Sequence, residues 1–391
     1  MSSRPLTVAW FSFFPVEWLP DLPEELRHTP KLHPASWQRV LLNCLEGNPA
    51  IRLHIVILRK QFERDLTFER KGVTFHLVKV PGGWRAPSLF WLDTILIRRV
   101  LRRVKPDVVH AWGTEQGAAL VAKRLGYPRV VTVQGLMTWY GQVVPQNRYE
   151  KLAGFLERYS LARSPLVTSE ARFSVRWVRE RNPHIRVEQI EHAPDPVFHR
   201  VVRRPQTQPL RFIFVGALDF RKGGDLTAQA LDRLRGEFPL ELIVLGKRKP
   251  DVAAILDRDV SPDFWRQVTM KTNLTHIEVA KELETATILL SPSRADVSPN
   301  AVKEAVAAGV PVVGTTVGGI PDYVIPGQNG VLCAPGSLDG LVEAIRTAAR
   351  HPQFSRGAVD PATLVRMREY LSPELMAKRF LEVYHLALQQ K

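Results

Sequence analysis

ATILLSPSRADVSPNAVKEAVAAGVPVVGTTVGGIPDYVIPGQNGVL, residues 286–332, is the stretch of sequence that decides the fold. Its apolar runs at 288–291 and 310–315 predict two buried strands. Between the two runs, residues 298–308 show a helix start followed by a helix-forming segment. A strand, a helix and a further strand in this order are typical of a parallel sheet covered by helices.

The same alternation of strand and helix patterns runs through the rest of the 391 residues. Further strands are expected at 6–13, 53–58, 108–111, 130–133, 211–215 and 240–245, and helices at 36–46, 88–104, 118–125 and 372–390. Residues 192–210 break the rhythm with four prolines and predict a domain linker. We therefore predict an α/β protein of two doubly wound, Rossmann-like domains, residues 1–200 and 201–371. A terminal helix, residues 372–391, is expected to return to the first domain.

Composition excludes several classes of protein. Contents of 45% hydrophobic and 24% charged residues are globular values and exclude a disordered chain. Two cysteines, Cys44 and Cys333, exclude a disulfide framework or a Cys-rich zinc site and fit a reducing compartment. No apolar run approaches the ~20 residues that a membrane-spanning helix needs. These features predict a cytoplasmic protein.

Positive charge is concentrated in the first half of the chain. Residues 1–200 carry 30 basic and 18 acidic side chains, whereas residues 201–391 carry 24 and 21. Eight of the nine tryptophans also lie in the first half. A basic half rich in tryptophan fits an anionic partner, which is a nucleic acid, a lipid headgroup or an acidic glycan.

Polar groups that suit a binding site follow the strand at 288–291. Asp296 lies in the loop after this strand. Ser298, Pro299 and Asn300 then open a helix, with Ser298 as the capping candidate and Pro299 at the first helical position. Backbone amides at such a helix terminus attract phosphate. Glu304 follows less than two turns later, so its carboxylate is expected to face the same cleft as Asp296.

Two glycines, Gly318 and Gly319, stand at the next strand–helix turn, where they would let a ligand approach the backbone. The segment resembles the donor-binding region of retaining glycosyltransferases of family 4 (glycosyl transferases group 1). That family has the GT-B fold, two doubly wound domains that face each other across a cleft. Its pattern is Glu, seven residues, Glu, then Gly-x-Pro-Val-Val and Gly-Gly-x-Pro-Glu. This chain matches the pattern from Glu304 onward, with aspartates at 296 and 322 in place of glutamates.

A second match to the family lies at residues 214–224, FVGALDFRKGG. It resembles the family's Val-Gly-Arg…Lys-Gly element, whose Arg and Lys hold the diphosphate of the sugar donor. Lys222 aligns with that Lys, Ala217 replaces the Arg, and Arg221 is expected to supply the missing charge. Fixed cations stabilise a departing diphosphate without a metal. Two glycines of this element are expected to bring the backbone close to the sugar donor, namely Gly216 and Gly223.

The resemblance also implies the chemistry and the remaining roles. It implies metal-independent transfer of a sugar from a nucleotide-diphosphate sugar to an acceptor hydroxyl, with retention of configuration. Glu304 would hold the donor ribose, Asp296 the donor sugar, and Leu274 would line the nucleobase. On the acceptor side it implies His110 and Gln134. A UDP- or GDP-sugar is the expected donor and a glycan or lipid-linked molecule the expected acceptor, with no metal and no separate cofactor.

Residues 88–105, SLFWLDTILIRRVLRRVK, form a basic amphipathic pattern. A helix of this kind lies on an anionic membrane, or packs on the sheet with its arginines in water. The pattern leaves both interpretations open. Peripheral contact with the inner face of a membrane is therefore a hypothesis at this point.

Three other functions stay open from the sequence. One is a different enzyme on the same fold, a nucleotide-sugar epimerase or a sugar phosphorylase. A second is a degenerate transferase kept as a partner subunit, which the departures at residues 134, 217 and 296 suggest. The third is a basic nucleic-acid-binding protein, which would bind with strong salt dependence. No nucleic-acid module is recognisable in the sequence, so no nucleic-acid partner is expected.

Overall fold

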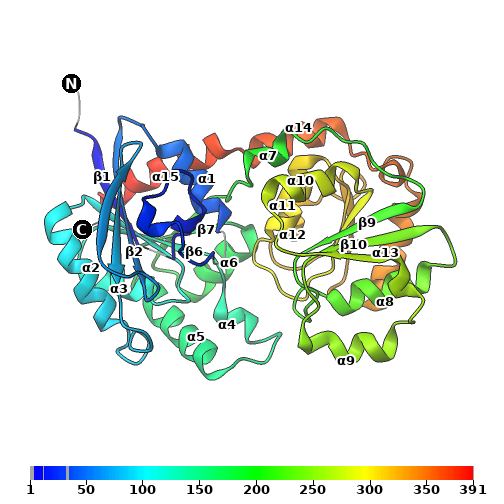
Figure 1. The fold of residues 1–391 in the computed structure, drawn as a ribbon, viewed down its shortest axis with the longest axis horizontal. Coiled ribbons are helices and arrows are strands. Elements are labelled where there is room, and N and C mark those ends of the chain that lie inside the picture. The colour runs from blue at the N-terminus through cyan, green and yellow to red at the C-terminus, as the bar shows by residue number, and fades with distance from the viewer. Residues whose placement is uncertain (1–3, 12, 32–34, 391) are drawn as a thin grey trace. The chain divides into compact units, whose positions relative to one another are not determined.

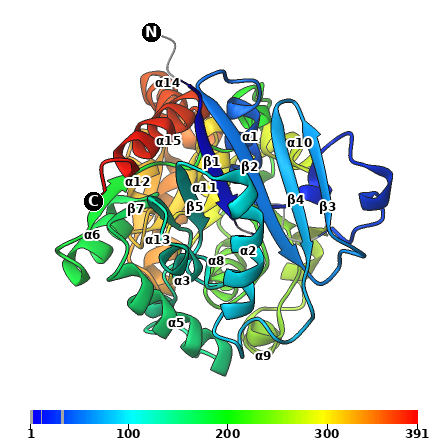
Figure 2. The ribbon, with the colours of Figure 1, turned by 90° about the vertical axis from the view of Figure 1, so that its left-hand side faces the viewer.

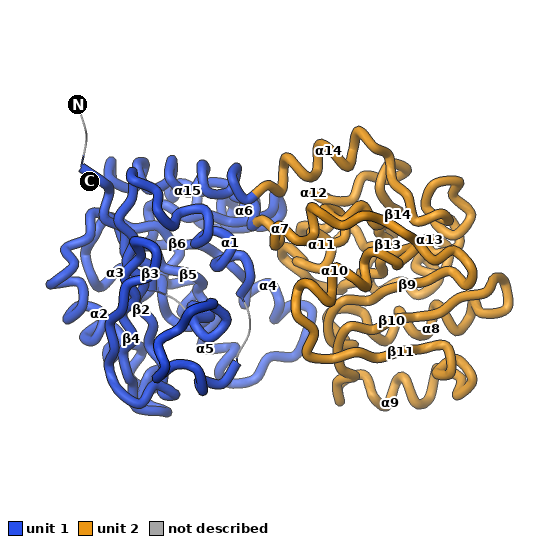
Figure 3. The backbone as a smooth tube through the Cα atoms, turned by 45° about the horizontal axis from the view of Figure 1, so that its top comes forward, with its two compact units in different colours: residues 1–192, 373–391 blue, residues 193–372 orange. Residues whose placement is uncertain are grey.

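The computed structural model describes residues 4–11, 13–31 and 35–390. The chain divides into two compact units (Figure 3). Unit 1 consists of residues 1–192 and 373–391, and unit 2 of residues 193–372. Each unit is a mainly or wholly parallel sheet with helices packed on it (Figure 1). The predicted fold class, α/β with two doubly wound domains, is confirmed.

The sheet of unit 1 has the strand order β3-β4-β2-β1-β5-β6-β7-β8. Every neighbouring pair is parallel except β3 and β4, which form an antiparallel edge. The strands are β1 Leu6–Phe11, β2 Ile51–Arg59, β3 Leu66–Arg70, β4 Val73–Lys79, β5 Val108–Trp112, β6 Arg129–Val133, β7 Leu166–Ser169 and β8 Arg186–Gln189. The predicted first strand included Ser12, which lies outside the described residues.

The helices predicted at 36–46, 118–125 and 372–390 are present in unit 1, and the structure adds others that were not predicted. The helices of this unit are η1 Val16–Trp18, η2 Glu24–Leu26, α1 Ser36–Leu45, α2 Trp91–Val104, α3 Ala118–Leu125, α4 Met137–Tyr140, α5 Arg148–Leu161, α6 Arg172–Arg181 and α15 Pro373–Ala387. The prediction that α2 begins at residue 88 was wrong. Leu89 and Phe90 have φ values of +47° and +60°, a left-handed conformation that cannot belong to an α-helix.

The terminal helix α15 belongs to unit 1, where it packs against α1 and β6. A buried hydrogen-bond chain joins it to the sheet. The Tyr384 hydroxyl accepts from Trp10 Nε1 at 2.8 Å and lies 2.9 Å from His110 Nδ1. His110 Nε2 lies 2.6 Å from the Thr132 hydroxyl. Buried polar groups on both sides of the contact are thus paired, which specifies where the helix docks.

His110 was predicted to face the acceptor, and the structure gives it a different place. The side chain is fully buried, and both ring nitrogens are hydrogen-bonded within unit 1. Burial lowers the pKa of His110 well below 6.5, so the ring is neutral. The His110 side chain projects from β5 towards Tyr384 of α15. It is therefore not part of the surface of unit 1.

The sheet of unit 2 is wholly parallel, with the strand order β11-β10-β9-β12-β13-β14. Its strands are β9 Leu210–Val215, β10 Leu240–Leu245, β11 Val268–Lys271, β12 Ile288–Ser291, β13 Val312–Thr315 and β14 Gly330–Cys333. The direction of strand order reverses between β9 and β12, as it does between β1 and β5 in unit 1. Open α/β sheets bind ligands beyond the carboxyl ends of the strands at such a reversal.

Both faces of the unit 2 sheet are covered, which explains its continuous apolar strands. Alternate residues of β9 point to opposite faces of the sheet and enter two separate cores. Phe212 and Phe214 pack in the core with α8 and α13, and Ile213 packs in the core with α10 and α11. The helices are α7 Pro196–His199, α8 Gly224–Leu234, α9 Pro250–Asp259, η3 Phe264–Gln267, α10 His276–Thr285, α11 Asn300–Ala308, α12 Ile320–Tyr323, α13 Leu338–Arg350, η4 Phe354–Arg356 and α14 Pro361–Tyr370.

The predicted linker, residues 192–210, is a folded part of unit 2 from residue 193 onward. Phe198 of α7 is fully buried in the core beside α10 and α11. The Arg203 guanidinium donates hydrogen bonds to the backbone carbonyls of Glu284 at 3.2 Å and Gly357 at 2.9 Å. The prolines indicated where the alternation of strands and helices is interrupted. Residues 193–210 are nevertheless folded, because Phe198 and Arg203 make long-range contacts within unit 2.

Candidate active site

Two loops meet where the strand order of unit 2 reverses. One follows β9 and leads into α8, and the other follows β12 and leads into α11. The first loop needs its glycines. Gly223 has a φ of +72°, and a Cβ there would lie 2.2 Å from the carbonyl oxygen of Pro292 in the second loop. Gly216 has a φ of +125°, and a Cβ there would lie 2.8 Å from Lys222 Nζ. Glycine therefore lets the two loops and the Lys222 amine pack closely.

Lys222 is the predicted phosphate-binding cation. Its backbone N–H donates to Asp219 Oδ1 at 2.7 Å, which closes the turn, and its side chain folds back over Gly216. It stands two residues before the start of α8, whose helix dipole adds partial positive charge. The first turn of α11, which begins at Asn300, follows the neighbouring loop. A lysine amine and two helix N-termini together suit a phosphate group.

Arg221 and Asp296, predicted as separate donor contacts, are linked to each other. Arg221 Nη1 lies 3.5 Å from Asp296 Oδ2 and donates to the carbonyl of Ala295 at 2.8 Å. A second pair joins the same loops, since the Arg294 guanidinium contacts both oxygens of Asp225 at 2.7 and 2.6 Å. The loops after β9 and β12 are therefore one cross-linked structure, and Arg221 holds the Asp296 loop in place.

Ser298 was predicted to cap α11, and this prediction was wrong. The N-cap position is Pro299, with no side-chain capping bond, and the helix begins at Asn300. The Ser298 hydroxyl instead lies 2.7 Å from the hydroxyl of Tyr323, which is fully buried. The reason is that proline at the N-cap leaves Ser298 one residue too early to reach the first turn, so its hydroxyl pairs with α12.

Glu304 lies in α11 and is buried, at 8% exposure. Burial raises the pKa of its carboxyl, and the positive charges of His276, Lys303 and Lys222 oppose this shift. Asp195 raises the pKa further, and its carboxylate lies 3.3 Å from His276 Nδ1. A buried carboxylate amid three nitrogen bases is typical of a functional site.

Sequence reasoning missed Asp195, His276 and Lys303 as neighbours of Glu304. Asp195 fell inside the predicted linker, and His276 has no neighbouring histidine or acid at a spacing that suggests a site. Lys303, next to Glu304 in a helix, reads as a surface lysine, yet it is fully buried. No signal in a single sequence marks these positions, because they converge only through the packing of α7, α10 and α11.

The remaining predicted donor residues lie along the same edge of unit 2. Gly318 has a φ of +56°, and Gly319 is the N-cap of α12, after β13. Leu274 follows β11 and is half-buried against the core. Asn300 is half-buried at the start of α11, and Pro299 beside it is buried.

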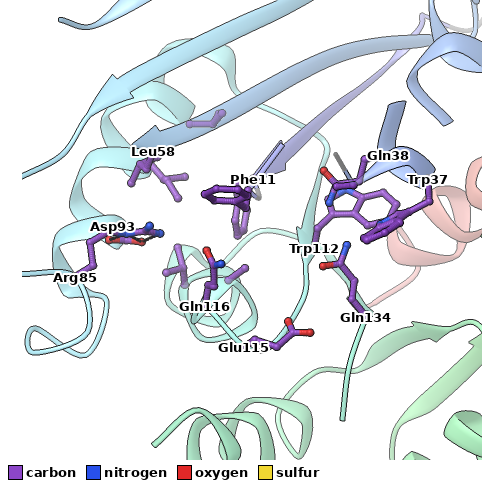
Figure 4. A pocket seen from close by; sticks show the side chains of 16 residues that line it. Phe11, Trp37, Gln38, Leu58, Arg85, Asp93, Trp112, Glu115, Gln116 and Gln134 are labelled. Carbon is purple, nitrogen blue, oxygen red and sulfur yellow. Dashed lines mark hydrogen bonds and ion pairs between the residues drawn. The ribbon is translucent and has the colours of Figure 1, made fainter. Parts of the chain in front are cut away.

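Gln134, the second predicted acceptor residue, lines a cavity of about 310 Å³ within unit 1 (Figure 4). The cavity lies at the carboxyl ends of β1, β2, β5 and β6, which includes the strand-order reversal between β1 and β5. Among the described residues no cluster of His, Cys, Asp or Glu has the geometry of a metal site. Among the described residues, the loops after β9 and β12 thus form a polar, cationic cluster in unit 2, and Gln134 lines a partly open cavity in unit 1.

Comparison with known families places both units in one family. A family model described as Glycosyl transferases group 1 matches residues 209–351, and one described as Glycosyltransferase Family 4 matches residues 39–197. The chain belongs to glycosyltransferase family 4.

Curated relatives of this chain have different names. It is 27% identical to "Glycogen synthase" of Mycobacterium tuberculosis (strain ATCC 25618 / H37Rv) over 64% of this chain and 62% of that protein. It is 24% identical to "GDP-mannose-dependent alpha-mannosyltransferase" of Corynebacterium glutamicum over 81% of this chain and 78% of that protein. The chain thus spans under two thirds of the mycobacterial relative.

Solved structures show that this chain has the GT-B fold. Sucrose-phosphate synthase from Thermosynechococcus elongatus superposes with a TM-score of 0.79 at 15% identity, over 97% of this chain and 98% of that one. HepE of Anabaena, in a complex with UDP-glucose, superposes with a TM-score of 0.69 at 12% identity, over 96% and 98%. The likeness at these identities concerns the fold alone.

Proposed function

We propose that the chain transfers a sugar from a nucleotide-diphosphate sugar to an acceptor hydroxyl, with retention of configuration and without a metal ion. The observation that carries the proposal is the position of Lys222, with its amine over Gly216 just before α8. Glu304 lies close enough to this amine for the two charges to interact. One cluster therefore offers a cation for the diphosphate and a buried carboxylate for hydroxyl groups.

The proposed reaction exchanges one bond at the anomeric carbon for another. The bond from that carbon to the diphosphate oxygen breaks, and the electron pair leaves with the diphosphate. The acceptor oxygen then bonds to the anomeric carbon on the same face, and its proton passes to a departing phosphate oxygen. Negative charge grows on the diphosphate as the bond breaks, so a fixed cation stabilises the transition state more than the ground state.

Four of the predicted donor residues have a side-chain role in this proposal. Lys222 and the amides that begin α8 and α11 would bind the diphosphate. Glu304 would accept hydrogen bonds from the ribose hydroxyls. Asp296, held by Arg221, would accept from the donor sugar. Asp296 stands where the family has Glu, and its side chain is one methylene shorter. We propose that Arg221 compensates for the shorter reach by anchoring the loop that carries Asp296.

UDP- or GDP-sugars are the proposed donors, supported by the names of relatives and neighbours. HepE was solved with UDP and with UDP-glucose, and the corynebacterial relative is called GDP-mannose-dependent. The ligands in these names, UDP, UDP-glucose and GDP-mannose, all contain a nucleoside diphosphate. The base and the sugar are set by residues outside the matched motifs.

A thermal-shift panel of UDP, GDP, ADP and dTDP tests the proposal directly. Saturation at ~100 times the dissociation constant adds about 2.7 kcal/mol to the free energy of unfolding. For a unit of this size we expect Tm to rise by roughly 5 °C or more with UDP or GDP. A protein whose Tm responds to none of the four would contradict nucleotide-sugar transfer and favour a degenerate relative.

The acceptor is proposed to be a glycan or a lipid-linked molecule at an anionic membrane surface. Three helices of unit 1 support this part of the proposal. Helix α2 packs against α3, and α3 against α5, so they form one continuous face, visible in Figure 2. Residues 84–105, 118–125 and 148–163 carry 12 basic and 3 acidic side chains, a net charge of +9. We call this face the α2–α3–α5 surface.

Aromatic and aliphatic side chains are exposed among these basic groups. Trp84 is 67%, Ile95 60% and Phe155 55% exposed. Cation–π contacts join the helices across the surface, from Arg124 to Trp91 at 4.3 Å and from Lys123 to Tyr159 at 4.7 Å. Two of its three acids, Asp93 and Glu157, are buried. Exposed apolar groups amid cations fit the interface of an anionic bilayer.

The described residues contain no helix that is both long and apolar enough to cross a bilayer.

Sedimentation with vesicles tests the α2–α3–α5 surface. We expect binding to vesicles of phosphatidylcholine with 30% phosphatidylglycerol, and loss of binding in high salt. The double variant Arg99→Glu/Arg103→Glu is expected to bind about 10-fold or more weakly, since each basic residue near the surface contributes ~1 kcal/mol. Arg266→Glu/Arg356→Glu, an exposed pair in unit 2 with the same charge change, is the control. Equal binding of both double variants would contradict this surface.

A further inference from the structure

The unit 1 cavity has chemistry that the sugar-donor motifs do not explain. Its walls are formed by side chains at the carboxyl ends of four strands, at the start of α1, and on α2 and α3. Figure 4 shows aromatic rings on one side of the space and the polar ends of several side chains on another. The lining includes Phe11, Trp37, Gln38, Trp112, Glu115 and Gln134.

The aromatic wall is held rigidly by the core. Trp112 ends β5 and stacks on buried His110, with ring centroids 4.3 Å apart. It also meets Trp10 edge-on at 5.3 Å. Trp37 stacks on His192 at 6.0 Å. A fixed aromatic wall binds a flat apolar face without loss of side-chain entropy, and the C–H face of a sugar or cyclitol ring is such a face.

Two hydrogen-bond donors of the lining are buried without a partner. Among the described residues, neither Trp112 Nε1 nor Gln134 Nε2 has a hydrogen-bond acceptor. Trp112 is 4% exposed, so water outside the protein does not satisfy it. A buried donor without a partner costs about 1–3 kcal/mol. A ligand with oxygen acceptors in the cavity would remove that cost, and native proteins rarely leave such groups unpaired.

Glu115 supplies the complementary acceptor. Its carboxylate lies against two glycines, since a Cβ on Gly113 would stand 2.4 Å from Oε2 and one on Gly135 3.0 Å from Oε1. Backbone groups of Thr114 and Gly135 hydrogen-bond to it. Burial raises the pKa of Glu115 to about 7, and nearby Glu157 adds to this shift. Figure 4 shows the Glu115 carboxylate beside the Gln134 amide.

Among the described residues, the lining of the cavity offers no unpaired cation to a charged ligand. The lining contains one described basic residue, Arg85, whose guanidinium contacts both oxygens of Asp93 at 2.9 and 2.7 Å. The pair neutralises itself, and Glu115 adds negative charge when it is ionised. A phosphate or carboxylate in the cavity would be desolvated without a counter-ion, which is strongly unfavourable. An uncharged ligand has no such penalty.

We infer that this cavity binds an uncharged, hydroxyl-bearing ring, packed against its aromatic side chains and hydrogen-bonded to Trp112 Nε1, the Gln134 amide and the Glu115 carboxylate. Identification of this ring as part of the sugar acceptor rests on the proposed function. Hydroxyl groups both accept and donate, so they match the two unpartnered N–H groups and the carboxylate together. The inference specifies a neutral acceptor ring, in contrast to a phosphorylated one.

Saturation-transfer difference NMR on the full chain tests the inference without any transfer reaction. The probes are methyl α-D-glucopyranoside, methyl α-D-mannopyranoside and myo-inositol, each beside its monophosphate. We expect saturation of at least one neutral probe, and at least about 10-fold weaker binding of its phosphate. Saturation of none of the neutral probes, or equal or tighter binding of a phosphate, would overturn the inference.

Matched variants locate the binding in the cavity. Gln134→Ala and Glu115→Gln are expected to weaken binding of the neutral probe about 10-fold each. The first removes the buried Gln134 Nε2 donor, and the second replaces a charged acceptor with a weaker, neutral amide. Glu180→Gln is the control, because Glu180 is exposed on α6, away from the cavity lining. This variant should bind the neutral probe as tightly as the parent. If Gln134→Ala and Glu115→Gln bind the probe as tightly as the parent, the cavity is not the site.

Nucleotide thermal shifts separate this inference from the proposed function. The cavity variants are expected to keep the Tm rise with UDP or GDP, because Lys222 and Glu304 lie in unit 2. A nucleotide shift without binding of the neutral probe refutes the cavity inference and leaves the proposed function standing. Binding of the neutral probe without any rise in Tm from a nucleotide refutes the proposed function and leaves the cavity inference standing.

Discussion

Replacing Lys222 with alanine is expected to lower kcat for sugar transfer by about 10²–10³-fold or more. The amine is the cation that lies over Gly216 at the entrance to α8, and the diphosphate gains charge as the glycosidic bond breaks. Loss of this cation removes an interaction that is strongest in the transition state. The measurement is the rate of nucleoside diphosphate release with saturating sugar donor.

Lys281→Ala is the matched control for Lys222→Ala. Lys281 is an exposed lysine on α10 of the same unit, so its removal changes the net charge equally. The Tm of both variants should stay near that of the parent, since neither residue is buried in a core. Near-normal turnover of a folded Lys222→Ala variant would refute the assigned role.

Glu304→Ala is expected to abolish detectable transfer and to weaken binding of the nucleotide about 10-fold or more. The buried carboxylate would accept two ribose hydroxyls, and hydrogen bonds to charged groups contribute about 1.5–3 kcal/mol each. Removal of a carboxylate whose pKa is raised by burial also relieves a desolvation cost, so we expect the variant to remain folded. Circular dichroism and the dissociation constant of UDP or GDP check both expectations.

The pH dependence of nucleotide binding provides a second readout for Glu304. Burial raises its pKa above 4.5, while His276, Lys303 and Lys222 oppose the shift and Asp195 adds to it. A protonated carboxyl is a poorer hydrogen-bond acceptor than a carboxylate. On acidification, the parent should therefore begin to lose affinity for the nucleotide at a higher pH than it would if Glu304 had the pKa of an exposed glutamate. This acidic limb should be absent from Glu304→Ala.

Exposed Glu369 on α14 is the control for Glu304. Glu369→Ala should leave turnover, affinity and the acidic limb unchanged. The assignment of Glu304 would be refuted if both alanine variants had the same turnover and the same pH profile.

The local patterns of the sequence predicted much of the fold. Strands β9, β10 and β12 lie within one residue of their predicted bounds, because a fully buried parallel strand is a short run of apolar residues. The resemblance to the family also indicated Lys222 and Glu304, and the structure brings the two charges close enough to interact. Predictions that depended on a single local signal were less secure. The serine at 298 looked like a helix cap, and its hydroxyl pairs with Tyr323 instead.

Partners far apart in the sequence explain the remaining differences. His110 resembled a ligand-facing residue, but Tyr384 of the terminal helix buries it, 274 positions later in the chain. The prolines of residues 192–210 suggested a free linker, whereas Arg203 binds carbonyls that lie some 80 and 154 positions away. Periodicity within a window of a few turns contains no information about such contacts.

By itself, the sequence determined that this protein is two α/β units, and its resemblance to the family indicated Lys222 and Glu304 as candidate donor-side residues. The two units follow from apolar periodicity, and the two candidate residues follow from the matched motifs. Only the tertiary structure decided that Arg221 holds Asp296, and that Trp112, Glu115 and Gln134 converge on one cavity. The physical reason is that burial, pKa and hydrogen-bond satisfaction belong to the surroundings of a group, and the fold of the whole unit creates those surroundings.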